Sequence, residues 1–136
     1  MQVQAIEPPA APARPPQVVQ IRKLELFIVP LAENERVCFE VHLLLSTNTG
    51  PLTSEWVLEA CDKPSDWVIW SYGFRKMLNA KQPCDAYELA RRCGGNSVYS
   101  HLARAALQQL IGKEQLVRAD RRTSLMERAS QYVCLF

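Results

Sequence analysis

Two amphipathic segments joined by a pair of glycines constrain the fold of this chain more than any other feature of its sequence. Residues 84–95 read CDAYELARRCGG, in which an aspartate is placed to cap a short helix and the closing glycines supply the positive φ of a tight turn. Asn96 or Ser97 then caps a longer helix, which Gly112 ends. The sequence therefore predicts helix, tight turn and helix in this part of the chain.

Two β-branched and apolar runs in the first half predict a β-hairpin. VVQIRKLELFIV occupies 18–29 and ends at Pro30, and RVCFEVHLLL at 36–45 has an apolar residue at every second position. A short polar segment links the runs. Because a lone hairpin is only marginally stable, its apolar face must pack on another part of the chain.

Two further helices are expected between the hairpin and the glycine turn. The first is a short helix over residues 53–61, capped by Thr53 or Ser54 and broken by DKPS. The second is an amphipathic helix over residues 66–81, which begins at Asp66. A strand at WVIW is the alternative to this second helix, because aromatic and β-branched residues favour strands.

The C-terminal segment contains two strand-like runs, residues 116–120 and 131–136, which are expected to pair. The intervening RRTSLMERAS is either a flexible loop or a short helix.

The order of elements from about residue 66 to 136 resembles the winged helix-turn-helix superfamily. The resemblance rests on ELA before the glycine turn, a Ser-rich helix start, and Leu107 and Leu110 ahead of a strand at 116–117. It covers about half the chain and indicates a fold rather than one family. The fold class it implies is α+β, an N-terminal β-hairpin plus a winged helix-turn-helix.

Three regions follow from these patterns. Residues 1–17 hold five of the nine prolines and are expected to form a disordered Pro/Ala-rich arm. Residues 18–62, the hairpin and short helix, are an interaction or dimerisation region. Residues 63–136 form the winged helix-turn-helix domain.

Charge is distributed unevenly along the chain. Residues 1–66 carry five basic and nine acidic side chains, whereas residues 67–136 carry eleven basic and five acidic ones. This asymmetry favours an anionic partner for the second half.

In a winged helix, the second helix of the pair enters the major groove and the wing contacts the backbone. Ser97, His101, Arg104 and Gln108 fall on one side of the predicted helix 96–111, and all of them can hydrogen-bond to bases or phosphates. The full set of predicted DNA-binding residues is Asn96, Ser97, Ser100, His101, Arg104 and Gln108 on this helix, Arg91 and Arg92 before it, and Arg118, Arg121, Arg122 and Arg128 in or near the wing.

Enzymatic and metal-binding motifs are not found in the sequence. It has no phosphate-binding glycine loop, no GxSxG, no HExxH and no CxxC. Cys84, Cys93, His101 and Cys134 lack the short paired spacings of a structural zinc site, and a thiol-sensor role for Cys93 beside two arginines is a minor alternative. We therefore predict no enzymatic activity, no cofactor and no metal site.

The sequence thus predicts a DNA-binding winged-helix protein, acting as a transcriptional or replication regulator or accessory factor on double-stranded DNA. The alternative is a non-enzymatic adaptor that uses the winged helix as a subunit of a multiprotein assembly. In either case the 18–62 hairpin is the candidate surface for a homodimer or a partner protein. The apolar runs are too short to span a bilayer, and the odd cysteine count favours reduced thiols. We expect a cytoplasmic location, in the nucleoid or nucleus if DNA-bound, and no membrane contact.

Overall fold

The computed structural model describes residues 18–33, 36–78, 83–111 and 120–135 of the chain. Four strands form an antiparallel sheet in the order β4-β3-β2-β6, and β1 pairs separately with β5. The elements in chain order are β1 (Val18–Val19), β2 (Ile21–Glu33), β3 (Arg36–Thr47), β4 (Gly50–Glu59), the 3-10 helix η1 (Ala60–Asp62), α1 (Trp67–Met77), β5 (Cys84–Asp85), α2 (Ala86–Arg92), α3 (Val98–Ile111), α4 (Asp120–Arg128) and β6 (Gln131–Leu135).

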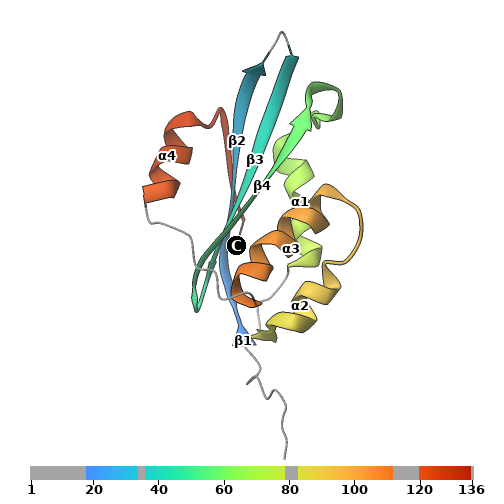
Figure 1. The fold of residues 1–136 in the computed structure, drawn as a ribbon, viewed down its shortest axis with the longest axis vertical. Helices are drawn as coiled ribbons and strands as arrows, with labels where there is room; N and C mark the ends of the chain where they lie inside the picture. The colour runs from blue at the N-terminus through green and yellow to red at the C-terminus, as the bar shows by residue number, and fades with distance from the viewer. Residues whose placement is uncertain (1–17, 34–35, 79–82, 112–119, 136) are drawn as a thin grey trace, which may run out of the picture.

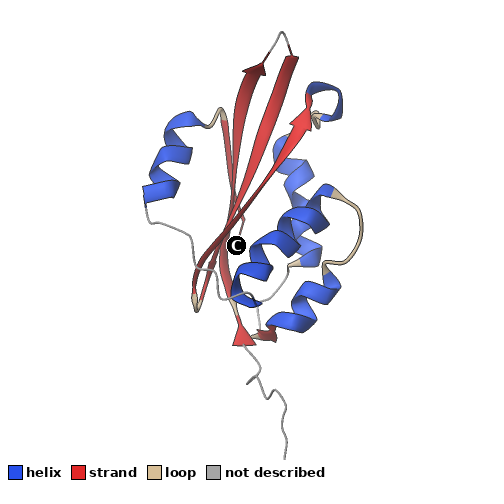
Figure 2. Cartoon of the chain, in the orientation of Figure 1, coloured by secondary structure: helices blue, strands red, loops and turns tan. Residues whose placement is uncertain are grey.

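The molecule is built in layers around the twisted four-stranded sheet. Helices α1, α2 and α3 cover one face of the sheet, and α4 lies on the opposite face (Figures 1 and 2). This arrangement is α+β, as the sequence predicts.

The predicted hairpin is confirmed as β2 and β3, which pair in antiparallel register from Lys23 opposite Ser46 to Glu33 opposite Arg36. Alternate residues of β2 point to opposite faces of the sheet. Leu24 and Leu26 belong to the main core, whereas Phe27 and Val29 belong to a second cluster with Leu125 of α4. Because helices cover both faces, the β2 sequence is apolar almost continuously.

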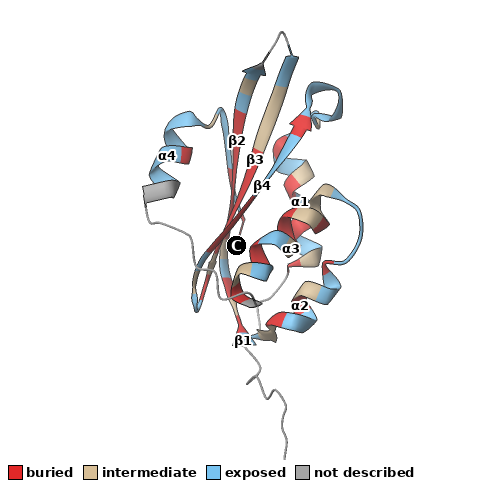
Figure 3. Cartoon of the chain, viewed as in Figure 1, coloured by how far each residue is buried: buried red, intermediate tan, exposed pale blue. Residues whose placement is uncertain are grey.

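The main core lies between the sheet and helices α1, α2 and α3. Its strand residues include Leu43 and Leu45 of β3, and its helix residues include Phe74, Leu102 and Leu107, all fully buried. Figure 3 shows this buried side of the sheet and the inward sides of the helices. Residues from the 18–62 and 63–136 regions thus share one core.

Helix α1 forms where the sequence predicts it, so the alternative of a strand at WVIW is wrong. The Asp66 carboxylate accepts hydrogen bonds from the amides of Val68 and Ile69 at 2.9 and 3.2 Å. This cap satisfies amides that have no partner inside the helix, while Trp67 and Phe74 bury the inward side.

The predicted short helix over residues 53–61 is wrong. Residues 50–59 form strand β4, which pairs with β3 from Thr47 opposite Gly50 to Cys38 opposite Glu59, and only residues 60–62 form a 3-10 turn. The run alternates, since Leu52 and Leu58 are buried in the core while Glu55 and Val57 are exposed. A ladder of this length outweighs the local capping signal.

The predicted pairing of residues 116–120 with 131–136 is not observed in the part of the chain that the structure describes. Residues 112–119 lie outside it, and Asp120 begins helix α4, so the segment left open as a loop or a short helix is a helix. Strand β6 pairs with β2, from Leu135 opposite Leu24 to Gln131 opposite Ile28. The C-terminal strand therefore extends the hairpin sheet.

Two further predictions concern the N-terminal arm and membrane-spanning helices. The proposed arm at residues 1–17 lies outside the described residues. Among the helices that the structure describes, none has the length and apolar character needed to span a membrane.

Candidate nucleic-acid interface

Helices α2 and α3 are joined by the tight turn that the sequence predicts. The Asp85 carboxylate caps α2 by accepting hydrogen bonds from the amides of Tyr87 and Glu88 at 2.8 and 3.3 Å. The chain then reverses through Gly95, whose φ of +135° lies in the region that favours glycine. The local sequence therefore accounts for the start of α2 and for the turn that follows it.

Of the two predicted caps, Asn96 and Ser97, it is Ser97 that caps α3. Its Oγ accepts a hydrogen bond from the Ser100 amide at 3.1 Å, and the two hydroxyl oxygens lie 3.0 Å apart. Ser100 is only 3% exposed and packs against Gly95, where an added Cβ would lie 3.2 Å from the Ser100 Oγ. Ser100 therefore does not lie on the outward side of α3 with the other predicted residues, because its side chain is buried against the turn.

The outward side of α3 carries the other predicted residues of this helix. Ser97 and Gln108 are exposed, as is Asn96 just before the helix, and His101 and Arg104 are half-buried. Arg104 Nη2 donates to His101 Nδ1 at 3.2 Å. The spacing in the sequence thus places Ser97, His101, Arg104 and Gln108 together on one side, as expected.

His101 contacts Trp56, a residue that the sequence pattern predicts to lie in a helix. Its imidazole stacks on the indole of Trp56 in β4, with ring centroids 4.5 Å apart and an angle of 2° between the planes. The alternation of Leu52, Ser54, Trp56 and Leu58 is the signal that identifies β4 as a strand and turns Trp56 toward α3.

Two more contacts attach α3 to β4. The Gln109 side chain donates to the Thr53 carbonyl and accepts from the Thr53 amide, the latter at 3.2 Å. The Ser54 hydroxyl donates to the Leu102 carbonyl at 2.6 Å. Gln109 was not among the predicted site residues, and a polar residue next to the apolar stripe of α3 is too common a signal to identify it.

Arg91 and Arg92 lie at the C-terminal end of α2, and both are exposed. Arg91 Nη2 donates to Glu88 Oε2 at 2.5 Å, which raises the pKa of Arg91. Arg92 Nη2 donates to the Cys84 sulfur at 2.9 Å. Both residues directly precede the turn that leads into α3, and both guanidinium groups contact residues nearer the start of α2.

The arginines expected in or near a wing are not part of this surface. Arg118 and the side chain of Arg121 lie outside the described residues. Arg122 and Arg128 belong to α4, on the opposite face of the sheet from α3 (Figure 1), and each faces a sheet carboxylate. Arg122 and Arg128 therefore do not belong to a wing beside α3, because their segment folds as a helix that packs on β2.

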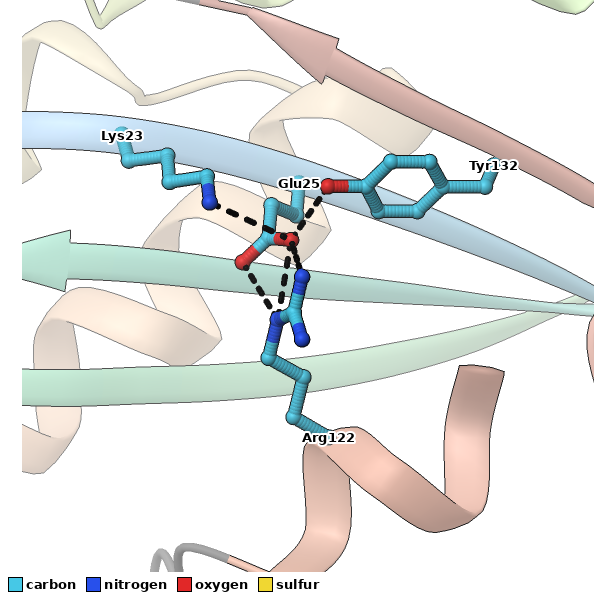
Figure 4. A network of polar contacts seen from close by, with 4 residues as sticks. All are labelled: Lys23, Glu25, Arg122 and Tyr132. Atoms are coloured by element: carbon cyan, nitrogen blue, oxygen red, sulfur yellow. Dashed lines mark hydrogen bonds and ion pairs between the residues drawn. The ribbon is translucent and has the colours of Figure 1, made fainter. Parts of the chain in front are cut away.

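Arg122 forms a network around the buried carboxylate of Glu25 (Figure 4). Its Nε and Nη2 donate to Glu25 Oε2 at 3.0 and 2.8 Å, the Tyr132 hydroxyl donates to the same oxygen, and Lys23 Nζ lies 3.8 Å away. Glu25 itself is 1% exposed. The network therefore links α4 and β6 to strand β2.

The network also shifts the pKa values of its members. Burial alone would raise the pKa of Glu25, but the hydrogen bonds from Arg122 and Tyr132 and the charges of Arg122 and Lys23 together lower it. Burial and the bond to Glu25 raise the pKa of Tyr132 to about 12. The ionised carboxylate and the neutral phenol are therefore the favoured forms.

The cysteines do not form the zinc set considered from the sequence. The group of potential metal ligands that the described residues bring together is instead Glu40, His42 and Glu55. Cys93 is buried in the core, and burial raises the pKa of its thiol to about 11 despite the neighbouring arginines. A high pKa and a buried sulfur argue against the thiol-sensor role.

Comparisons with protein-family models, curated proteins and solved structures found no match for this chain.

Proposed function

We propose that this protein binds double-stranded DNA through the α2–α3 unit, with α3 in the major groove, as a non-enzymatic transcriptional or replication regulator or accessory factor. The observation that carries the proposal is the outward side of α3. Ser97, His101, Arg104 and Gln108 lie there on a helix that a tight glycine turn joins to two exposed arginines. A helix with this side fits the major groove, where such side chains bond to base edges.

The distribution of charge between the two faces of the sheet supports our assignment of the DNA-binding surface to α2 and α3. Glu25, Glu40 and Glu55 are paired with Leu44, Val29 and His42 in the sheet register, and these positions share the face that α4 covers. The α2–α3 side instead carries Arg91, Arg92 and Arg104. These three acidic residues of the sheet therefore lie on the face away from α3.

The stacking of His101 on Trp56 supports a role for His101 in positioning the Arg104 guanidinium. Arg104 donates to His101, and His101 rests on the indole, so the guanidinium is partly ordered without a ligand. A preorganised arginine loses less side-chain entropy when it binds guanine through two hydrogen bonds. We assign Arg104 to base contact and Arg91 and Arg92 to phosphate contact.

The test is fluorescence anisotropy with a mixed-sequence duplex. We expect Arg91→Gln with Arg92→Gln to weaken binding to all duplexes alike, and Arg104→Gln to reduce discrimination among sequences. Arg36→Gln is the matched control, because Arg36 is 79% exposed at the end of the hairpin far from α3 in the sheet register. Equal binding by all four proteins contradicts the assignment of these residues.

An adaptor function is the second candidate, and one observation favours it. On α1, the side chains of Val68, Ile69 and Tyr72 are 46%, 65% and 46% exposed and lie on the outward side of the helix. Exposed apolar residues that gather on one side are typical of protein contacts. The hairpin is a weaker surface for strand pairing than expected, because β2 is paired on both sides between Leu24 and Ile28. Failure to bind duplex DNA at low salt would favour the adaptor.

A further inference from the structure

A histidine and two glutamates gather on the face of the sheet opposite α3. Glu40 and His42 lie on β3 and Glu55 lies on β4, directly opposite His42 in the register. One potential ligand atom from each residue lies within 4.8 Å of the others. The cluster takes no part in the nucleic-acid interface proposed above.

The hydrogen bond between His42 and Glu40 indicates that the Nε2 atom of the imidazole carries a proton. Nε2 lies 3.2 Å from Glu40 Oε1, and an ionised carboxylate only accepts, so Nε2 carries the proton. In the neutral ring, Nδ1 then holds the lone pair. A carboxylate that accepts from the second nitrogen of a histidine is the usual outer partner of a metal-binding imidazole.

Within the described part of the chain, His42 Nδ1 has no hydrogen-bond partner although it is fully buried. His42 is 2% exposed, and its Nδ1 lies 3.5 Å from Glu55 Oε2 without the geometry of a hydrogen bond. A buried nitrogen lone pair that faces a carboxylate oxygen is unfavourable unless a proton or a metal ion lies between them.

The separation of these two atoms fits a shared metal ion. Zn²⁺ binds imidazole nitrogen and carboxylate oxygen at about 2.0–2.2 Å, so two ligands of a tetrahedral site lie about 3.4 Å apart. His42 Nδ1 and Glu55 Oε2 are separated by 3.5 Å. Mg²⁺ and Ca²⁺ prefer oxygen ligands alone, which leaves zinc and its neighbours in the first transition series.

We propose that His42 Nδ1 and the Glu55 carboxylate bind a divalent transition-metal ion of the Zn²⁺ class, with Glu40 as the residue that orients the imidazole. Glu55 is the route of entry, because its side chain is 56% exposed whereas that of His42 is 3% exposed. Arg128 Nη1 lies 3.9 Å from Glu40 Oε1 and balances the charge of the orienting carboxylate. Water completes the coordination of the ion.

The experiment is a Zn²⁺ titration of the untagged chain, followed by NMR of the imidazole nitrogens. The chain has two histidines, so His101 serves as an internal control in every spectrum. Before zinc is added, we expect the His42 Nε2 signal to show a bound proton. Zinc then shifts His42 Nδ1 in a saturable manner and leaves His101 unchanged.

Two variants separate the site from general zinc binding. Glu55→Gln removes the carboxylate from an exposed position and is expected to weaken the zinc affinity of His42 by at least about tenfold. Glu59→Gln changes an exposed carboxylate on the same strand and is expected to leave the affinity unchanged. His42 signals that do not respond to zinc, or that respond equally in the wild type and Glu55→Gln, overturn the proposal.

Discussion

Gly73 of α1 lies against the aromatic ring of Tyr99 of α3, so closely that a Cβ at position 73 would be 2.5 Å from Tyr99 Cζ. The ring is fixed there because the Tyr99 hydroxyl donates to the Trp70 carbonyl at 2.6 Å. The missing side chain therefore lets α1 and α3 approach each other, and it positions the helix that carries the candidate interface.

Gly73→Ala is expected to destabilise the protein, although alanine is the better helix former. The helical preference contributes about 0.5–1 kcal/mol in favour of alanine, whereas overpacking against a fixed ring costs about 1–3 kcal/mol. Chemical denaturation measures the net change. In a Tyr99→Leu background the same substitution should become neutral or stabilising, and an equal loss in both backgrounds would show that the ring is not the cause.

Leu125→Ala is expected to weaken the attachment of α4 to the sheet. Leu125 is 1% exposed and packs with Phe27, Val29 and Leu44, and such truncations cost about 2–5 kcal/mol. Hydrogen exchange of the α4 amides and the free energy of unfolding measure the effect. Met126→Ala, at an exposed neighbouring position, is the control and should change stability by less than about 0.5 kcal/mol.

Acid is expected to weaken the network around Glu25. Because the pKa of Glu25 is lowered in the folded state, its ionised form stabilises the fold above the unfolded-state value of 4.5, and this contribution is lost as the pH falls through the lower folded-state value. Glu25→Gln should therefore be less stable than the wild type at neutral pH. The difference, measured by urea denaturation, should shrink as the pH falls below 4.5. A difference that is constant with pH would contradict the network.

High pH is expected to destabilise the protein by ionising the Tyr132 phenol. Its pKa of about 12 lies above the ordinary value of 10.0, so the stabilisation is complete below pH 10 and is lost as the pH rises toward 12. Ultraviolet titration of the four tyrosines should show one phenol that ionises near pH 12. Tyr132→Phe should remove that phase, and its persistence would assign it to another tyrosine.

The elements with strong local signals are those that the sequence predicts well. The caps at Asp66 and Asp85 and the turn at Gly95 define α1, α2 and α3, since each depends on residues only a few positions apart. The pairing of β6 with β2 joins residues more than a hundred positions apart, and nothing local distinguishes it from the expected wing. For the same reason, the sequence does not predict that Arg122 and Arg104 lie on opposite faces of the sheet.

The site was predictable in part because helical spacing fixes which residues share one side of α3. The contacts that these side chains make with other parts of the chain could not be predicted. Ser100 closes the turn, and His101 rests on a tryptophan from a strand far along the chain. The buried Glu25 was a missed signal, since a carboxylate inside an apolar strand needs a cationic partner, and here that partner is Arg122.

The dependence of duplex affinity on salt tests the central claim most directly. Each neutralised phosphate contributes about −0.9 to the slope of log affinity against log salt. Arg91 and Arg92 are the residues assigned to phosphate contact, so the account predicts a slope of about −2 for the wild type, and the Arg91→Gln, Arg92→Gln variant should lose about two units of that slope. A slope near zero, or one that this double substitution leaves unchanged, would contradict the account.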